Sequence, residues 1–130
     1  MRALEITVAM TLADAEHAIR AALATQGFGV LTEIDVSATL EAKLGVERPP
    51  LKILGACNPT LANRALDIDP SVALLLPCNV VLDETDEGGT RVRVVDPLAL
   101  MDDPRFAALA DEAANRLQAA IDDLGVRAAS

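Results

Sequence analysis

Two cysteines, each followed by an asparagine, are the residues of this chain whose types are best suited to chemistry. The pairs Cys57-Asn58 and Cys78-Asn79 are twenty-one residues apart. A thiolate is a nucleophile and a metal ligand, and an asparagine amide both donates and accepts hydrogen bonds. We therefore take Cys57 and Cys78 as candidate catalytic or metal-binding residues, and Asn58 and Asn79 as candidate cofactor-binding residues. The alternative is that the cysteines only pack, since cysteine is among the most buried residue types.

Each cysteine also stands at a position where the chain changes course. Cys57 directly precedes Asn58-Pro59, which is typical of a helix start, and the amide groups of a helix N-terminus stabilise an anion such as a thiolate. Cys78 follows Pro77, which cannot donate to a sheet and so predicts a bulge, a break or an edge position. Irregularities of this kind are enriched beside functional sites.

Whether Cys57 and Cys78 meet depends on how their strands are arranged. In adjacent parallel strands, both would emerge at the same end of the sheet. In antiparallel strands with the second beginning at Val72, they would be about six residues apart, or roughly 20 Å. A disulfide needs Cα atoms within roughly 7 Å. A chain break at Pro77 is a third possibility. We predict two free thiols, with Cys57 the more reactive.

The rest of the sequence gives little indication of a metal site or a nucleotide-binding motif. The cysteine spacing fits no standard zinc pattern, so a four-ligand site would need carboxylates or a second subunit. His17 is the only histidine, and its position outside the apolar stripe of its predicted helix indicates a solvated residue. The acidic run 83–87 lacks the ligand spacing of a calcium loop. Gly27 and Gly29 follow a helix and open a strand, the reverse of a dinucleotide motif. The cofactor, if any, stays unknown.

The composition favours one globular domain over residues 1–130. Hydrophobic residues make up 52% of the chain and charged residues 24%. The formal charge is −9, and the aromatic residues are Phe28 and Phe106 alone. A nucleic-acid-binding surface needs clustered cations and often aromatic rings for stacking, so we expect no nucleic-acid partner.

The sequence predicts no membrane partner and a cytoplasmic location. No stretch approaches the roughly 18 uncharged apolar residues of a membrane span. The apolar run 6–13 is flanked by Glu5 and Asp14 and lacks a convincing cleavage site, so we do not interpret it as a signal peptide. Two cysteines do not make a disulfide-rich secreted scaffold.

Apolar periodicity predicts a two-layer α+β domain. Strands are expected at 4–10, 28–36 and 51–57, in a β-rich segment at 72–82, and in a hairpin that pairs 80–84 with 91–95. Helices are expected from Thr11 to about 26, after Ser37, from Asn58 to about 66, and from 104 to about 124, where Gly125 should stop the last one. In the second strand, Val30, Thr32, Ile34 and Val36 are expected to share one face. Alternating strands favour an antiparallel or mixed sheet with helices on one face.

We also predict a homodimer. The segments 51–57 and 72–82 have few polar positions. A sheet with helices on one face leaves apolar surface or an open edge that a second copy can cover.

Two longer motifs carry a family resemblance. Residues 54–59 read Leu-Gly-Ala-Cys-Asn-Pro, and residues 74–81 read Leu-Leu-Leu-Pro-Cys-Asn-Val-Val. Together with the segments 34–36, 43–46 and 96–97 and with Met101, they resemble the bacterial family named domain of unknown function 302, in a Cys-Asn-Pro and Pro-Cys-Asn subgroup. The resemblance implies a fold similar to the TATA-binding-protein type, with strand, helix, four strands and helix. It implies no DNA binding, because fold does not fix function.

The family has no established activity, and its members with a histidine motif in place of Cys-Asn-Pro offer nothing to transfer. We expect a small-ligand or metal binding module with its site around the two Cys-Asn pairs. The alternative is a thiol-dependent redox or sulfur-handling protein with Cys57 as nucleophile and Cys78 as resolving partner. A third possibility is a structural partner protein whose cysteines only pack. Whether the chain is an enzyme stays open.

Overall fold

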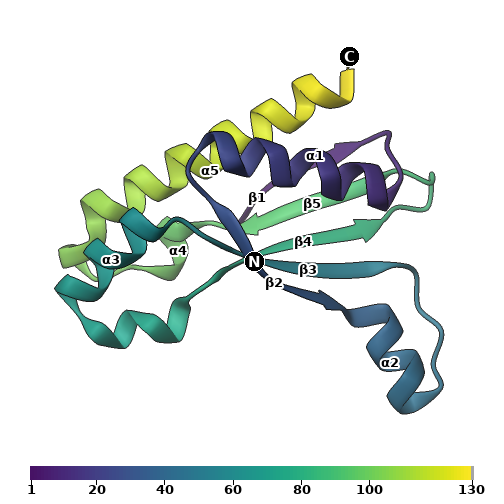
Figure 1. Ribbon diagram of the computed structural model, residues 1–130, viewed down its shortest axis with the longest axis horizontal. Helices are drawn as coiled ribbons and strands as arrows, with labels where there is room; N and C mark the ends of the chain where they lie inside the picture. Colours follow the sequence, from purple (N-terminus) through teal and green to yellow (C-terminus); the bar gives the residue numbers. More distant parts are fainter. Residues whose placement is uncertain (130) are drawn as a thin grey trace.

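Five strands form one antiparallel sheet in the computed structural model, which describes residues 1–129 (Figure 1). The strands are β1 (Ala3–Val8), β2 (Gly29–Asp35), β3 (Leu51–Cys57), β4 (Cys78–Glu84) and β5 (Thr90–Val95). Their order across the sheet is β1-β5-β4-β3-β2, and every neighbouring pair is antiparallel. The predicted α+β class with an antiparallel sheet is confirmed.

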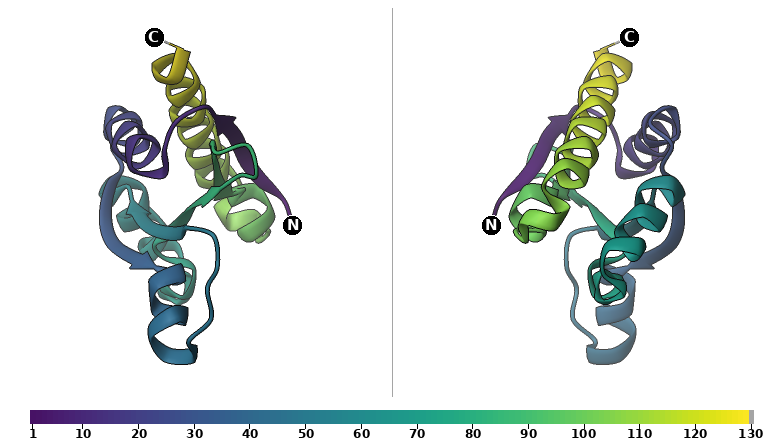
Figure 2. Two further views of the ribbon diagram at one scale, coloured as in Figure 1. Left: turned by 90° about the vertical axis from the view of Figure 1, so that its right-hand side faces the viewer. Right: turned by 90° about the vertical axis from the view of Figure 1, so that its left-hand side faces the viewer.

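Helices cover one face of this sheet and leave most of the other open. The two long helices, α1 (Leu12–Thr25) and α5 (Ala107–Ala129), lie side by side over one face (Figures 1 and 2). The shorter elements are α2 (Val36–Leu44), α3 (Pro59–Ile68), the 3-10 turn η1 (Pro70–Leu75), α4 (Pro97–Leu100) and the 3-10 turn η2 (Pro104–Phe106). Figure 2 shows α2 projecting from the sheet, away from α1 and α5. Among residues 1–129, the layers are therefore helix and sheet, with no third layer over the central strands.

The main core lies between the sheet and the two long helices. The inward side chains of the central strands are fully or almost fully buried, namely Leu54, Val80, Leu82, Val92 and Val94. They pack with residues of α1 and α5 that include Ile19, Leu23, Leu117 and Leu124. Each such side chain contributes about 1.5–3 kcal/mol of burial free energy. This alternation fixes which side chains of β1, β4 and β5 face outward.

The predicted helix after Ser37 begins two residues earlier than expected. Asp35, not Ser37, is the N-cap of α2, and its Oδ1 accepts a hydrogen bond from the Ala38 amide at 2.9 Å. The Ser37 hydroxyl donates to the same Oδ1. Aspartate and serine are both good N-cap residues. Because Asp35 comes before Ser37 in the chain, the helix begins there. The Thr11 cap of α1 is confirmed.

The face assignment within β2 was wrong at Val30. The register shifts between Val30 and Thr32, which marks a β-bulge. Val30 therefore pairs with Ala56 and packs against the main core, whereas Thr32 pairs with Gly55 on the opposite face. One inserted residue reverses the alternation, which a period-two pattern cannot show.

The β-rich segment 72–82 contains a strand only in its second half. Residues Pro70–Leu75 form the 3-10 turn η1, the Leu76–Pro77 peptide bond is cis, and β4 begins at Cys78. The chain break at Pro77 is the third possibility named above. Val72 is buried in a second, smaller apolar cluster with Ala65, Phe106 and Leu109. The hydrophobicity of the first half of this segment thus reflects burial against helices and not strand pairing.

The last helix does not stop at Gly125. It continues to Ala129, and Gly125 lies inside it. A Cβ atom at this position would lie 3.0 Å from Ile6 Cδ1 of β1. The glycine therefore allows the helix to approach the sheet closely, and is not a helix end.

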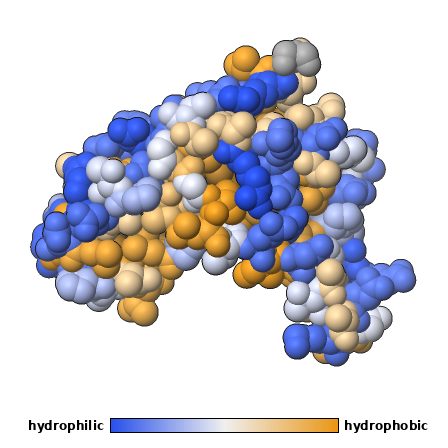
Figure 3. All heavy atoms as spheres, viewed as in Figure 1, coloured by the Kyte–Doolittle hydropathy of each residue, from blue (hydrophilic) through white to orange (hydrophobic). Residues whose placement is uncertain are grey.

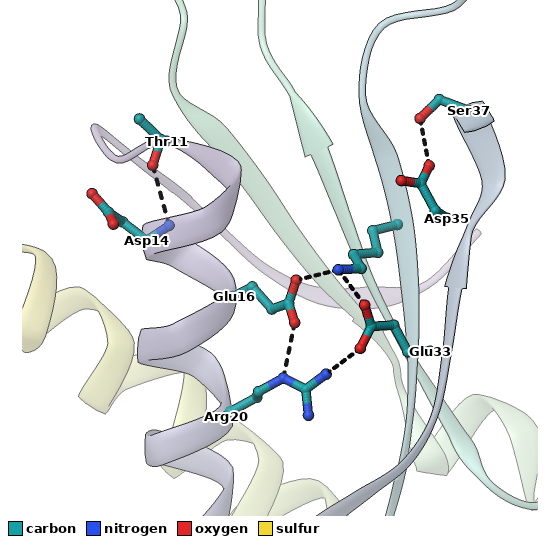
Figure 4. Close-up of polar contacts among 8 residues, drawn as sticks. Thr11, Asp14, Glu16, Arg20, Glu33, Asp35 and Ser37 are labelled. Carbon is teal, nitrogen blue, oxygen red and sulfur yellow. Dashed lines mark hydrogen bonds and ion pairs between the residues drawn. The ribbon is translucent and has the colours of Figure 1, made fainter.

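Four charged side chains tie α1 to the edge of the sheet (Figure 4). Glu16 accepts from Lys52 Nζ at 2.7 Å and from Arg20 Nε at 2.9 Å. Glu33 of β2 accepts from Arg20 at 2.9 Å and also pairs with Lys52. The closed ring of alternating charges fixes α1 against β2 and β3.

Candidate functional site

Cys57 and Cys78 lie on neighbouring strands at the same end of the sheet. Ala56 of β3 pairs with Cys78 of β4, so Cys57 stands one residue beyond the partner of Cys78. The separation of about 20 Å expected for antiparallel strands was wrong, because that estimate began the second strand at Val72 and β4 begins at Cys78. Both thiols are free, as predicted.

The two cysteines share one small, apolar crevice. Both line a crevice of about 40 Å³ together with Phe28, Leu61 and Met101. A volume of this size accommodates little more than a water molecule. Burial raises the pKa of the Cys78 thiol, and a thiolate at Cys57 would raise it further. Cys78 is thus held in its neutral, less nucleophilic form.

These surroundings give a definite expectation for alkylation. We expect iodoacetamide at pH 8 to modify Cys57 several times faster than Cys78, because the thiolate is the reacting species. The variants Cys57→Ser and Cys78→Ser each leave one thiol, whose rate mass spectrometry can follow across pH. Equal rates for the two single-cysteine variants would contradict the expectation. The greater reactivity of Cys57 stays a prediction until that measurement.

The two asparagines occupy different kinds of position. Asn58 is buried, and its side chain serves the fold. Its Oδ1 accepts from the Leu61 amide at 3.1 Å and caps α3, while its Nδ2 donates to the Gln26 carbonyl at 3.1 Å. Asn79 is exposed on the outer face of β4 and lines a groove there. Of the two, it is Asn79 whose side chain has no hydrogen-bond partner within residues 1–129 and lies beside a space large enough for a ligand.

That groove runs over the open face of the sheet and has a volume of about 760 Å³. Its floor is made by outward side chains of β1, β5 and β4, and its walls by the end of η1 and by Leu100 of α4. In Figure 3, hydrophobic side chains gather at the lower left over η1, and the lower edge of the molecule is hollowed between η1 and α2. Cys78 lines both this groove and the small crevice, whereas Cys57 lines the crevice alone. The lining residues of the groove are Met1, Arg2, Ala3, Glu5, Leu74, Leu75, Leu76, Pro77, Cys78, Asn79, Val81, Arg91, Arg93, Val95 and Leu100.

Two arginines of β5 project into the groove, but their partners differ. Arg91 binds Asp83 with both ends of its guanidinium, at 3.2 Å from Nε and 2.7 Å from Nη2. This bond raises the pKa of Arg91. Arg93 has a long contact of 3.6 Å to the same carboxylate, and its buried Nε has no hydrogen-bond partner among residues 1–129. Arg93 therefore retains most of its donors.

Sequence reasoning missed these two arginines, although a signal was present. Arg91 and Arg93 are two apart on a predicted hairpin strand, so they must share one face. Their neighbours Val92 and Val94 had to face the core, which leaves the arginines on the open side. The leucines 74–76 were assigned to a strand, so their place as a wall of the groove could not be predicted.

The described residues offer no ready metal centre. Residues 1–129 contain no group of three or more His, Cys, Asp or Glu side chains placed to hold a metal ion. His17 is exposed on α1, as predicted. Within that part of the chain, no third His, Cys, Asp or Glu side chain is placed to complete a metal site at the two cysteines.

Known proteins resemble this chain over nearly its whole length. The family described as "Domain of unknown function DUF302" matches residues 4–124. The chain belongs to the DUF302 family. A solved structure, the "uncharacterized conserved protein DUF302 from Bacillus stearothermophilus", has 29% sequence identity and a TM-score of 0.87. The likeness covers 95% of this chain and 98% of the other. No curated protein matches.

DUF302 membership confirms the family resemblance and leaves the function unassigned. The element order of this DUF302 chain agrees with the expected strand, helix, four strands and helix once α2, α3 and the short helical turns are set aside. Its likeness to the TATA-binding-protein fold stays a prediction. No helix within residues 1–129 is long and apolar enough to cross a membrane.

Proposed function

We propose that this DUF302 chain is a small-ligand-binding module whose site is the groove on the open face of the sheet. The observation that carries the proposal is the groove itself. Its volume of about 760 Å³ lies within the roughly 300–1,000 Å³ of typical small-molecule sites. Apolar walls with a few convergent polar groups are also typical of such sites. The Cys-Asn pair at 78–79 contributes to it, whereas the pair at 57–58 does not.

A groove-filling variant tests this proposal. Val81 lies on the groove floor and is half-buried, so Val81→Trp should fill the groove without disturbing the core. The probe is Nile red, an uncharged apolar fluorophore. We expect saturable fluorescence enhancement with one probe per wild-type chain, and at least a tenfold loss of affinity in Val81→Trp.

The matched control is Leu66→Trp. Leu66 is exposed on α3, outside the groove, so this variant adds the same ring elsewhere. It should bind Nile red as the wild type does. Unchanged binding by Val81→Trp, or equal loss in both variants, would contradict the proposal.

Thiol chemistry is the second candidate function, with Cys57 as nucleophile and Cys78 as resolving partner. It is favoured by one observation, the neighbouring positions of Cys57 and Cys78 on β3 and β4. The crevice that both cysteines line is too small for all but the smallest substrates, and burial disfavours the Cys78 thiolate. The binding module is therefore the better supported proposal, and saturable Nile red binding that Val81→Trp removes would distinguish it from thiol chemistry.

We also propose that two copies pair through the edge strand β2. Strand β2 has a neighbour on one side only, and Leu31 and Ile34 on it are 68% and 49% exposed. Unpaired edges with exposed apolar side chains invite a further strand. The adjoining α2 has no buried residue, so a second copy would also support that helix. Light scattering should give twice the chain mass of 13.6 kDa, and a value of 13.6 kDa would contradict the dimer.

A further inference from the structure

We infer that the ligand of the groove is an amphipathic carboxylic acid whose carboxylate binds Arg93 and whose apolar chain lies along the leucine wall. The inference rests on the proposed function and adds the chemical class of the ligand. It depends on the pairing of the groove's arginines and on the position of Arg93 beside the apolar part of the groove.

The groove collects arginines although the chain as a whole is acidic. The chain has a formal charge of −9. The groove is nevertheless lined by Arg2, Arg91 and Arg93 and by one carboxylate, Glu5. Asp96 and Asp83, which are not among the lining residues, neutralise Arg2 and Arg91. An anionic guest is therefore expected at Arg93 and not from a general excess of positive charge.

Of the three arginines, Arg93 is the one with no carboxylate oxygen of residues 1–129 within hydrogen-bonding distance. Arg2 pairs with Asp96 at 2.8 Å, and Arg91 is held by Asp83. The contact of Arg93 with Asp83 is beyond hydrogen-bonding distance at 3.6 Å. A guanidinium has five N–H donors in a planar fork that matches the two oxygens of a carboxylate. The free donors of Arg93 therefore favour a planar, bidentate anion.

The surroundings of Arg93 supply the apolar half of the site. In the sheet register, Arg93 lies between Glu5 of β1 and Val81 of β4. Val81 on the floor and Leu74 on the η1 wall line the same groove, and Leu74 is 88% exposed. A ligand that consisted only of a small anion would leave this surface uncovered. An acid with an apolar chain satisfies both Arg93 and the leucines.

Calorimetric titration with decanoate and 1-decanol tests the inference, because the two probes share a chain and differ in the head group. We expect the wild type to bind decanoate at least tenfold more tightly than 1-decanol. Arg93→Leu should remove this advantage and leave 1-decanol binding unchanged within about twofold. Arg93→Lys, which retains the charge and loses the planar fork, should give an intermediate loss.

A control variant, a folding check and a third probe test whether the effect is specific to Arg93 and to a carboxylate. Arg64→Leu removes an exposed arginine of α3 that binds Glu112 outside the groove, and should leave decanoate binding unchanged. Thermal melting should show Arg93→Leu folded, since the variant removes a buried N–H that has no partner. Decyl phosphate is a third probe, and tighter binding of it than of decanoate would overturn the assignment of a carboxylate.

The outcomes distinguish this inference from the proposed function. If neither decanoate nor 1-decanol binds while Nile red does, the carboxylate inference fails and the groove stands. If none of the three probes binds, both proposals fail. If 1-decanol binds as tightly as decanoate, or if Arg93→Leu leaves decanoate binding unchanged, the carboxylate inference fails while the groove stands.

Discussion

Replacing Gly55 with valine is expected to lower the free energy of unfolding by about 3 kcal/mol. Gly55 lies in the middle of β3, where Thr32 of β2 and Pro77 cover its outer side. A Cβ atom on Gly55 would meet Thr32 Oγ1 and would lie 2.7 Å from Pro77 Cγ. The proline ring is constrained by its own backbone, so the neighbours cannot yield without moving the chain that leads into β4. Denaturation in urea measures the change.

The matched control is Gly29→Val, at the start of the neighbouring strand β2. Gly29 is exposed, and a Cβ atom there would meet no atom within 4 Å. Its backbone does not have a positive φ, so valine adds β propensity without strain. We expect its unfolding free energy to stay within about 1 kcal/mol of the wild type. Equal destabilisation by the two variants would show that lost glycine flexibility, and not the cover by Thr32 and Pro77, is responsible.

Replacing Glu16 with glutamine is expected to cost about 1–2 kcal/mol at pH 7, in proportion to the charged hydrogen bonds it weakens. Glu16 is 16% exposed and accepts from both Lys52 and Arg20 (Figure 4). Burial raises the pKa of Glu16, but the hydrogen bonds from Lys52 and Arg20 outweigh it, so the pKa falls below the usual 4.5. The same contacts raise the pKa of Lys52.

The sign of the pH dependence follows from that lowered pKa. A carboxyl group whose pKa is lower in the folded protein stabilises the fold fully above its unfolded pKa, near 4.5. This contribution is lost as the pH falls through the lower, folded value. The stability difference between wild type and Glu16→Gln should therefore be full at pH 7 and shrink steadily below about 4.5.

An exposed carboxylate with a similar pair of partners provides the control. Glu112 on α5 accepts from Arg64 and Arg116, all three of them at the surface. Surface ion pairs contribute little because water screens them. Chemical denaturation from pH 3 to pH 8 should show a smaller effect for Glu112→Gln than for Glu16→Gln. A Glu16 effect that did not change with pH would contradict the assigned cause.

The sequence was sufficient for the fold class and for most elements, because the alternation in β1, β4 and β5 and the caps at Thr11 and Asn58 are local signals. It failed where distant contacts decide the outcome. The run at 72–82 is apolar for two different reasons, since Val72 packs against helices and Val80 against the main core. A glycine near the end of an apolar helix is typical of a helix end. Gly125 instead lies inside α5, where it leaves room for the Ile6 side chain.

The candidate site was predicted only in part for the same reason. Asn79 and Cys78 do line the groove, whereas the Asn58 side chain caps α3 and Cys57 lines only the small crevice. The decisive residue, Arg93, has no hydrogen bond to Asp83. Asp83 binds Arg91 and lies 3.6 Å from Arg93. A competition between two arginines for one carboxylate depends on side-chain geometry that no spacing in the sequence reveals.

Amide chemical shifts during a decanoate titration test the central claim most directly. Resonances of the ¹⁵N-labelled chain report where a ligand lies without any change to the protein. If decanoate binds in the groove, the largest amide shift changes should occur around Arg93 in β5, around Val81 in β4 and in residues 74–77. These changes should saturate at one decanoate per chain. Shifts centred on the crevice between Cys57 and Phe28, or spread evenly over the surface without saturation, would contradict it.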